Sequence, residues 1–103
     1  MFNKQFAIEE ADKFFNECAK YNLNFSYAYL FGSTLTDSCT DESDIDILLV
    51  SDNFTNDKIE NLKLLARANK KFYYIDAHPF SNDYFKKGDP FINEIKTKGY
   101  KLI

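Results

Sequence analysis

The sequence predicts a small α+β or α/β sandwich, in which helices pack against a single β-sheet. Its 103 residues are the length of one domain with one hydrophobic core, so we expect residues 1–103 to form a single domain. Hydrophobic residues make up 45% and charged residues 28% of the chain, which is typical of an ordinary globular protein. The spacing of the apolar residues changes along the chain in the order helix, strand, strand, helix, strand, helix.

The first two elements differ clearly in their apolar periodicity. Residues 4–21 are predicted to form an amphipathic helix. Its apolar positions recur at helical spacing: Ile8, Ala11, Phe15, Cys18 and Ala19. Residues 25–31 alternate as a strand does, with aromatic side chains on one face and Ala28 and Leu30 on the other. Gly32 ends this strand.

The second predicted strand covers residues 44–50, after a polar, turn-prone stretch at 33–43. Beyond its first three positions this strand is apolar on both faces. A strand with two apolar faces needs cover on both sides, so we expect it to be central in the sheet.

A helix over about residues 57–69 follows, which Asn53 or Thr55 could cap. The third strand is predicted at 72–77, and Pro79 is expected to break it. The helix should turn its apolar positions inward: Ile59, Leu62, Leu65 and Ala66.

The last elements are short and have clear boundary signals. A helical turn is predicted at 81–86, and Asp89 with the proline after it opens a helix at 91–98 that ends at Gly99. Residues 100–103 are candidates for an edge strand.

Charge and composition exclude several function classes. Lys and Arg number 13 against 16 Asp and Glu, a net charge of −3, and Arg67 is the one arginine. A nucleic-acid binder needs a basic stripe, so we expect no direct nucleic-acid binding. Cys18 and Cys39 fit no metal or disulfide spacing, which favours a reducing, cytoplasmic compartment. With no long apolar run, we expect no signal peptide and no membrane association.

Paired carboxylates are the main chemical feature of the sequence. Asp44 and Asp46 are two positions apart on a predicted strand, so their side chains project from the same face. Two like charges at the start of an apolar strand are unfavourable unless a cation offsets them. Mg²⁺ suits this role because it binds a few carboxylates and keeps other positions for water and phosphates. Asp76 on the third strand offers a third carboxylate. The sequence leaves open whether its side chain projects from the same face of the sheet as Asp44 and Asp46.

Gly32 and Ser33 complement these acids. A glycine at a strand end lets the backbone approach a ligand closely, and exposed N–H groups with a serine hydroxyl can hold phosphate oxygens.

Together these residues resemble a known family, the minimal nucleotidyltransferases of the DNA polymerase β superfamily. Its signature is Gly-Ser, ten residues, then Asp-x-Asp, and here Gly32-Ser33 precedes Asp44-Ile45-Asp46 by ten residues. The segment 75–80 is similar to the family's third-acid strand, and 91–99 to its closing helix.

The resemblance implies a nucleotidyltransferase fold of the α+β class: a small mixed sheet with core strand order 1-2-3 and helices packed mainly on one face. It implies transfer of a nucleoside monophosphate, with AMP from ATP as the expected pair, to an acceptor hydroxyl. Asp44, Asp46 and Asp76 would be catalytic and would hold one or two Mg²⁺ ions, or Mn²⁺. Gly32 and Ser33 would bind the nucleotide phosphates.

The resemblance also implies a partner. A short domain has no second module to bind an acceptor, and minimal members act as antitoxins beside helical HEPN-type toxins, so we expect adenylylation of such a protein. An alternative stays open, because Thr36 and Asp37 stand where the family often has Arg and Gly. In that alternative the domain is catalytically weak or inactive and acts as a protein-binding antitoxin. For His78 two roles stay open, a structural one and contact with the nucleotide or the acceptor.

Overall fold

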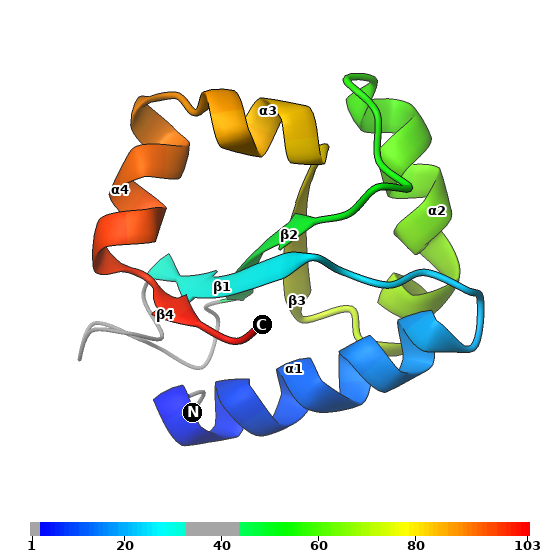
Figure 1. Ribbon diagram of the computed structural model, residues 1–103. Helices are drawn as coiled ribbons and strands as arrows, with labels where there is room; N and C mark the ends of the chain where they lie inside the picture. Colours follow the sequence, from blue (N-terminus) through cyan, green and yellow to red (C-terminus); the bar gives the residue numbers. More distant parts are fainter. Residues whose placement is uncertain (1–2, 33–43) are drawn as a thin grey trace.

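The computed structural model describes residues 3–32 and 44–103, which form a four-stranded sheet with helices on either side (Figure 1). The strand order is β3-β2-β1-β4. Along the chain the elements are α1 (Lys4–Ala19), β1 (Tyr27–Phe31), β2 (Ile45–Val50), α2 (Lys58–Lys71), β3 (Ile75–Phe80), α3 (Asn82–Lys87), α4 (Pro90–Lys98) and β4 (Tyr100–Lys101).

The sheet is mixed, as the resemblance implies. β1 pairs antiparallel with β2, and β2 pairs parallel with β3. The short β4 adds an antiparallel strand on the outer side of β1. The core order 1-2-3 is therefore confirmed, and β4 extends it by one edge strand beyond β1.

The third strand differs from the sequence prediction. β3 covers Ile75–Phe80, later than the expected 72–77, and it contains Pro79 where a break was expected. Because β3 is the outer neighbour of β2, one of its sides carries no further strand of the sheet. A proline is tolerated in an edge strand, where its missing N–H interrupts no ladder. The prediction of a break at Pro79 was wrong for this reason.

Both faces of the sheet are covered by helices. The long helices α1 and α2 pack with one side of the sheet in a large apolar core. The shorter α3 and α4 cover the opposite side through Phe85, Ile92 and Ile95. β2 is central and buried on both faces, which confirms that part of the prediction. The two long helices lie on one face, as expected. The other face is also covered, because Leu48 and Val50 of β2 are buried there against α3 and α4.

The inward face of α2 also differs from the prediction. Leu65 is buried as expected, but Asn61 is buried with it, while Ile59 is 67% exposed. The Asn61 amide accepts a hydrogen bond from the Thr55 backbone N–H at 2.8 Å and donates one to the Thr55 carbonyl at 2.7 Å. These bonds satisfy the buried amide, so a polar residue can face the interior here. Asp57 caps the helix, in place of the two candidates predicted from sequence.

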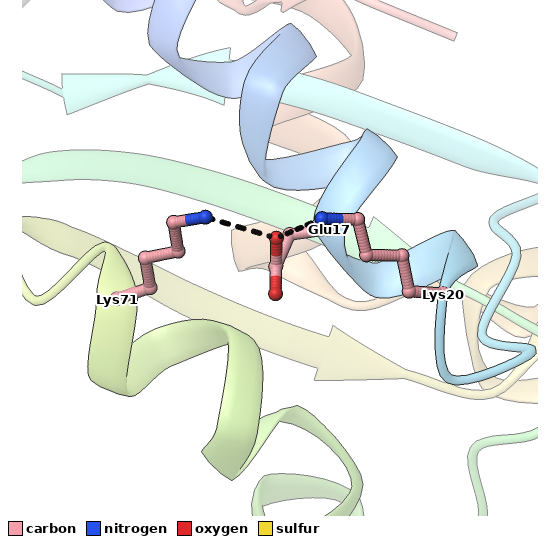
Figure 2. Close-up of polar contacts among 3 residues, drawn as sticks. All are labelled: Glu17, Lys20 and Lys71. Carbon is pink, nitrogen blue, oxygen red and sulfur yellow. Dashed lines mark hydrogen bonds and ion pairs between the residues drawn. The ribbon is translucent and has the colours of Figure 1, made fainter.

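A carboxylate connects the two long helices. Glu17 on α1 accepts hydrogen bonds from the Lys20 ammonium at 3.1 Å and the Lys71 ammonium of α2 at 3.4 Å (Figure 2). The Lys20 ammonium, with that of Lys71, holds the pKa of Glu17 below its ordinary value despite burial. On the apolar side of α1, Phe14 is fully buried. Within residues 3–32 and 44–103, every helix is too short or too polar to cross a bilayer.

Candidate active site

Strand register places two of the predicted site residues side by side. Asp46 of β2 is paired with Phe31 of β1 on one side and with Asp76 of β3 on the other. Directly paired residues on neighbouring strands project from the same face of a sheet. The open question of which face carries Asp76 is thereby answered: it shares the face of Asp46, on the side that α3 and α4 cover.

His78 joins this pair from the same strand as Asp76. Two positions along β3, it projects from the same face, and its Nε2 lies 3.5 Å from Oδ1 of Asp46 and 3.4 Å from Oδ2 of Asp76. One donor atom from each of the three residues lies within 4.8 Å of the others. The imidazole ring contacts two phenylalanine rings, Phe31 at 5.1 Å and Phe91 at 6.0 Å between centroids.

The Nε2 atom of His78 is buried and makes no hydrogen bond among the described residues, although two carboxylates are near it. Buried polar atoms are nearly always satisfied, so an atom like this one needs an explanation. A divalent cation between the imidazole and the carboxylates would supply one, because the three groups offer the nitrogen and oxygen donors that such ions bind. The side chains present therefore fit a metal site.

Gly32 brings the backbone against this cluster. Its φ is +82°, a conformation that favours glycine, and a Cβ built on it would collide with Oδ2 of Asp46. A side chain at this position would therefore be strained by the positive φ and would require the Asp46 carboxylate to move. The structure places the Gly32 backbone against Asp46, and its expected approach to a ligand stays a prediction.

The remaining predicted site residues lie apart from the cluster or outside the described residues. Asp44 is exposed, directly before β2, and among residues 3–32 and 44–103 it is not in the group of close donor atoms. Ser33, Thr36 and Asp37 lie outside the described residues. Sequence reasoning left His78 open, although its spacing of two from Asp76 on a strand was a usable signal.

The cluster is accessible from one side. The Asp46 side chain is 27% exposed and that of Asp76 is 53% exposed. His78 also forms part of the wall of a cavity of about 490 Å³, between the start of α2, the end of β3 and α3. This volume is in the range of small-molecule sites. Of the three clustered residues, His78 is the one that lines this cavity.

Comparison with protein families identifies the fold and its general chemistry. A family model described as "Polymerase beta, Nucleotidyltransferase" matches residues 13–102, which is most of the chain and includes every predicted site residue. The chain belongs to this family. A comparison with curated proteins found no match. Membership makes the chain a nucleotidyltransferase domain with a nucleotide as substrate, in a family that typically uses divalent metals.

Proposed function

We propose that this nucleotidyltransferase domain transfers AMP from ATP to a hydroxyl group of a partner protein. The observation that carries the proposal is the register of β2 and β3, which sets Asp46 beside Asp76 on one face, with Gly32 against Asp46. Asp44, Asp46 and Asp76 are the proposed metal-binding and catalytic residues. Gly32 and Ser33 are proposed to hold the phosphates.

In this proposal the carboxylates of Asp44, Asp46 and Asp76 hold Mg²⁺ or Mn²⁺. A bound cation supplies positive charge that offsets the charge developing on the α-phosphoryl group and the leaving pyrophosphate. The backbone at Gly32 lies against Asp46, so phosphates bound there would face the carboxylates. This proximity lets the chain position the triphosphate without a large basic patch.

Asp76 is the proposed proton acceptor. Its side chain is more exposed than that of Asp46, and it belongs to the edge strand β3. The acceptor oxygen attacks the α-phosphorus and the bond to the β-phosphate oxygen breaks. The hydroxyl proton passes to the Asp76 carboxylate and pyrophosphate leaves. We therefore place the acceptor on the side of β3.

The acceptor is proposed to be a tyrosine or other hydroxyl on a helical HEPN-type toxin, with this chain as its antitoxin in the cytoplasm. Exposed apolar side chains support a protein partner, since Ile59 and Leu64 on α2 and Tyr73 before β3 all lie at the surface. The thiol of Cys18 is free, in keeping with a reducing compartment.

A second function is favoured by one sequence observation. Thr36 and Asp37 replace the Arg and Gly common in the family, which removes a positive group from the phosphate region and adds a negative one. The domain would then neutralise its partner by binding alone.

One experiment separates the two functions. The chain is mixed with Mg²⁺, ATP labelled at the α-phosphate and the product of the adjacent gene, which is tested as the proposed partner. We expect label on the partner, and expect Asp46→Asn to abolish it. Asp12→Asn, which removes an exposed carboxylate on α1, is the matched control and should label normally. Tight binding without label, unchanged by Asp46→Asn, would support the binding function and contradict the enzyme.

A further inference from the structure

We propose that His78 is a direct protein ligand of the metal ion held by Asp46 and Asp76, and that it makes the site prefer Mn²⁺ over Mg²⁺. This inference rests on the proposed metal site of the nucleotidyltransferase and deepens it. The carboxylates alone would form an all-oxygen site. The imidazole nitrogen changes the donor set, and with it the choice of ion.

The distances among the three side chains fit coordination of one ion. Donor atoms about 2.1 Å from a common octahedral ion lie about 3 Å apart when they are neighbours in the coordination shell. The His78 Nε2 lies 3.5 Å from one carboxylate oxygen and 3.4 Å from the other, slightly beyond that spacing. Small side-chain movements would therefore bring the three donor atoms to the spacing of neighbouring ligands, and the remaining positions of the ion would be left for water and phosphate oxygens.

The environment of the ring directs Nε2 into the site. Phe31 and Phe91 contact the imidazole ring, and the first of these contacts is edge-on. The parallel pairing of β2 with β3 places His78 opposite Leu48, two residues beyond the paired Asp46 and Asp76. This pairing fixes the backbone position of His78 relative to the two acids. Nε2 is buried without a hydrogen bond among the described residues, and an unsatisfied buried polar atom lowers the stability of the folded chain. Coordination of an ion by Nε2 would remove this loss of stability.

The chemistry of the donor set decides the ion preference. Mg²⁺ is a hard ion that takes oxygen ligands in near-ideal octahedral geometry. Imidazole nitrogen suits first-row transition metals better, and in the divalent series affinity for such mixed sites rises from Mn²⁺ onward. Mn²⁺ also accepts the carboxylate and phosphate oxygens that nucleotidyl transfer needs. A site of two carboxylates and one imidazole therefore favours Mn²⁺ over Mg²⁺.

The test uses the full chain without an affinity tag and Mn²⁺ as the probe. His78 is the one histidine in the sequence, so any histidine signal from bound Mn²⁺ must come from it. Pulsed EPR of the Mn²⁺-loaded chain should show coupling to an imidazole ¹⁴N nucleus. Selective labelling with ¹⁵N-histidine should replace that coupling with the ¹⁵N pattern. Absence of any histidine coupling from Mn²⁺ bound at Asp46 would overturn the proposal.

Two variants test the ion preference. His78→Phe keeps an aromatic ring between Phe31 and Phe91 but removes the nitrogen, and His78→Asn offers an oxygen donor instead. Loss of an outer-shell partner alone weakens metal binding about 10–100-fold, so His78→Phe should weaken Mn²⁺ binding at least about tenfold in an EPR titration. The Mg²⁺ affinity of His78→Phe, measured by competition with Mn²⁺, should fall less. His78→Asn should show a smaller preference for Mn²⁺ over Mg²⁺ than the parent chain. Equal losses for both ions would contradict the role in ion choice.

Asp46→Asn distinguishes failure of this inference from failure of the proposed function. If Mn²⁺ binding requires Asp46 but shows no histidine coupling, His78 is not a ligand and the carboxylate site stands. If Mn²⁺ binding is unchanged by Asp46→Asn, the proposed metal site itself is wrong. Urea unfolding of each variant shows that it is folded, and the ¹⁵N experiment on the parent chain does not depend on any variant.

Discussion

Gly32 and Asp46 constrain each other, although they are far apart along the chain. The positive φ of Gly32 disfavours a side chain at this position, and a Cβ there would require the Asp46 carboxylate to move. The proposed binding of phosphates at Gly32 makes use of this absence of a side chain. At Cys18, by contrast, burial raises the pKa of the thiol to about 12, which supports its interpretation as a small hydrophobic residue and not as a nucleophile.

Gly32→Ala should therefore impair both folding and transfer. We expect a loss of about 1 kcal/mol or more of unfolding free energy from the positive φ alone. Displacement of Asp46 should in addition lower transfer by about a hundredfold. Urea unfolding and the labelling assay measure the two effects.

Gly88→Ala is the matched control for this prediction. Gly88 has a φ of +76°, and its Cβ would come within 2.8 Å of the Asn93 side chain, away from the carboxylates. Gly88→Ala should lower the unfolding free energy by an amount similar to Gly32→Ala but leave nucleotidyl transfer unchanged. Equal loss of transfer in both variants would mean that Gly32 acts through stability alone.

At the scale of elements, polar contacts hold α1 in place beside the sheet. The Tyr74 hydroxyl, just before β3, donates a hydrogen bond to Glu10 on α1. This bond, together with the Lys13 ammonium, lowers the pKa of Glu10 despite burial. Burial and the same hydrogen bond raise the pKa of Tyr74 to about 12. Glu10 thus stabilises the contact between α1 and the strand that carries Asp76.

The contribution of Glu10 to stability should depend on pH. Because its folded pKa is below the unfolded value of 4.5, the stabilisation is complete above that value and is lost as the pH falls through the folded pKa. We expect Glu10→Gln to lower the unfolding free energy by about 1 kcal/mol at neutral pH. The difference should shrink well below pH 4.5.

Urea unfolding of the parent and variant at both pH values tests this. Glu9→Gln changes an exposed neighbour on the same helix and serves as the control. A Glu10→Gln deficit that stays constant with pH would show that the carboxylate charge is not what stabilises the contact.

For the whole molecule, the carboxylate site should cost stability until an ion is bound. Asp46 and Asp76 are directly paired on neighbouring strands, and like charges in that position repel. A ligand that binds only the folded state stabilises it by mass action. The metal-free and metal-bound proteins should therefore respond to the same substitution in opposite directions.

Asp46→Asn tests this reversal. Without metal the variant should be as stable as the parent or more stable, because one of two like charges is removed. With Mn²⁺ at about 100 times its dissociation constant, the parent should gain about 2.7 kcal/mol, and the variant should gain little. Thermal unfolding with and without Mn²⁺ is the measurement. A parent more stable than the variant without metal would argue that Asp46 has a structural role in place of a metal-binding one.

The accuracy of prediction differed among elements for identifiable reasons. Asp89 caps α4 and Gly99 ends it as expected, because capping depends on neighbouring residues. Pro79 was misinterpreted because only the sheet order shows that β3 is an edge strand. The face of α2 was missed because it follows from the hydrogen bonds between Asn61 and Thr55, which no apolar periodicity reveals.

The sequence by itself determined that Gly32 ends one strand and that Asp46 and Asp76 lie on two others, because strand periodicity and turn chemistry are local properties. It also determined the family, through the spacing of these residues. Only the tertiary structure decided that Asp46 is paired with Asp76 and that the Nε2 of His78 lies beside both. Register between β2 and β3 depends on packing of residues distant in sequence, and a shift of one residue would turn Asp76 to the other face.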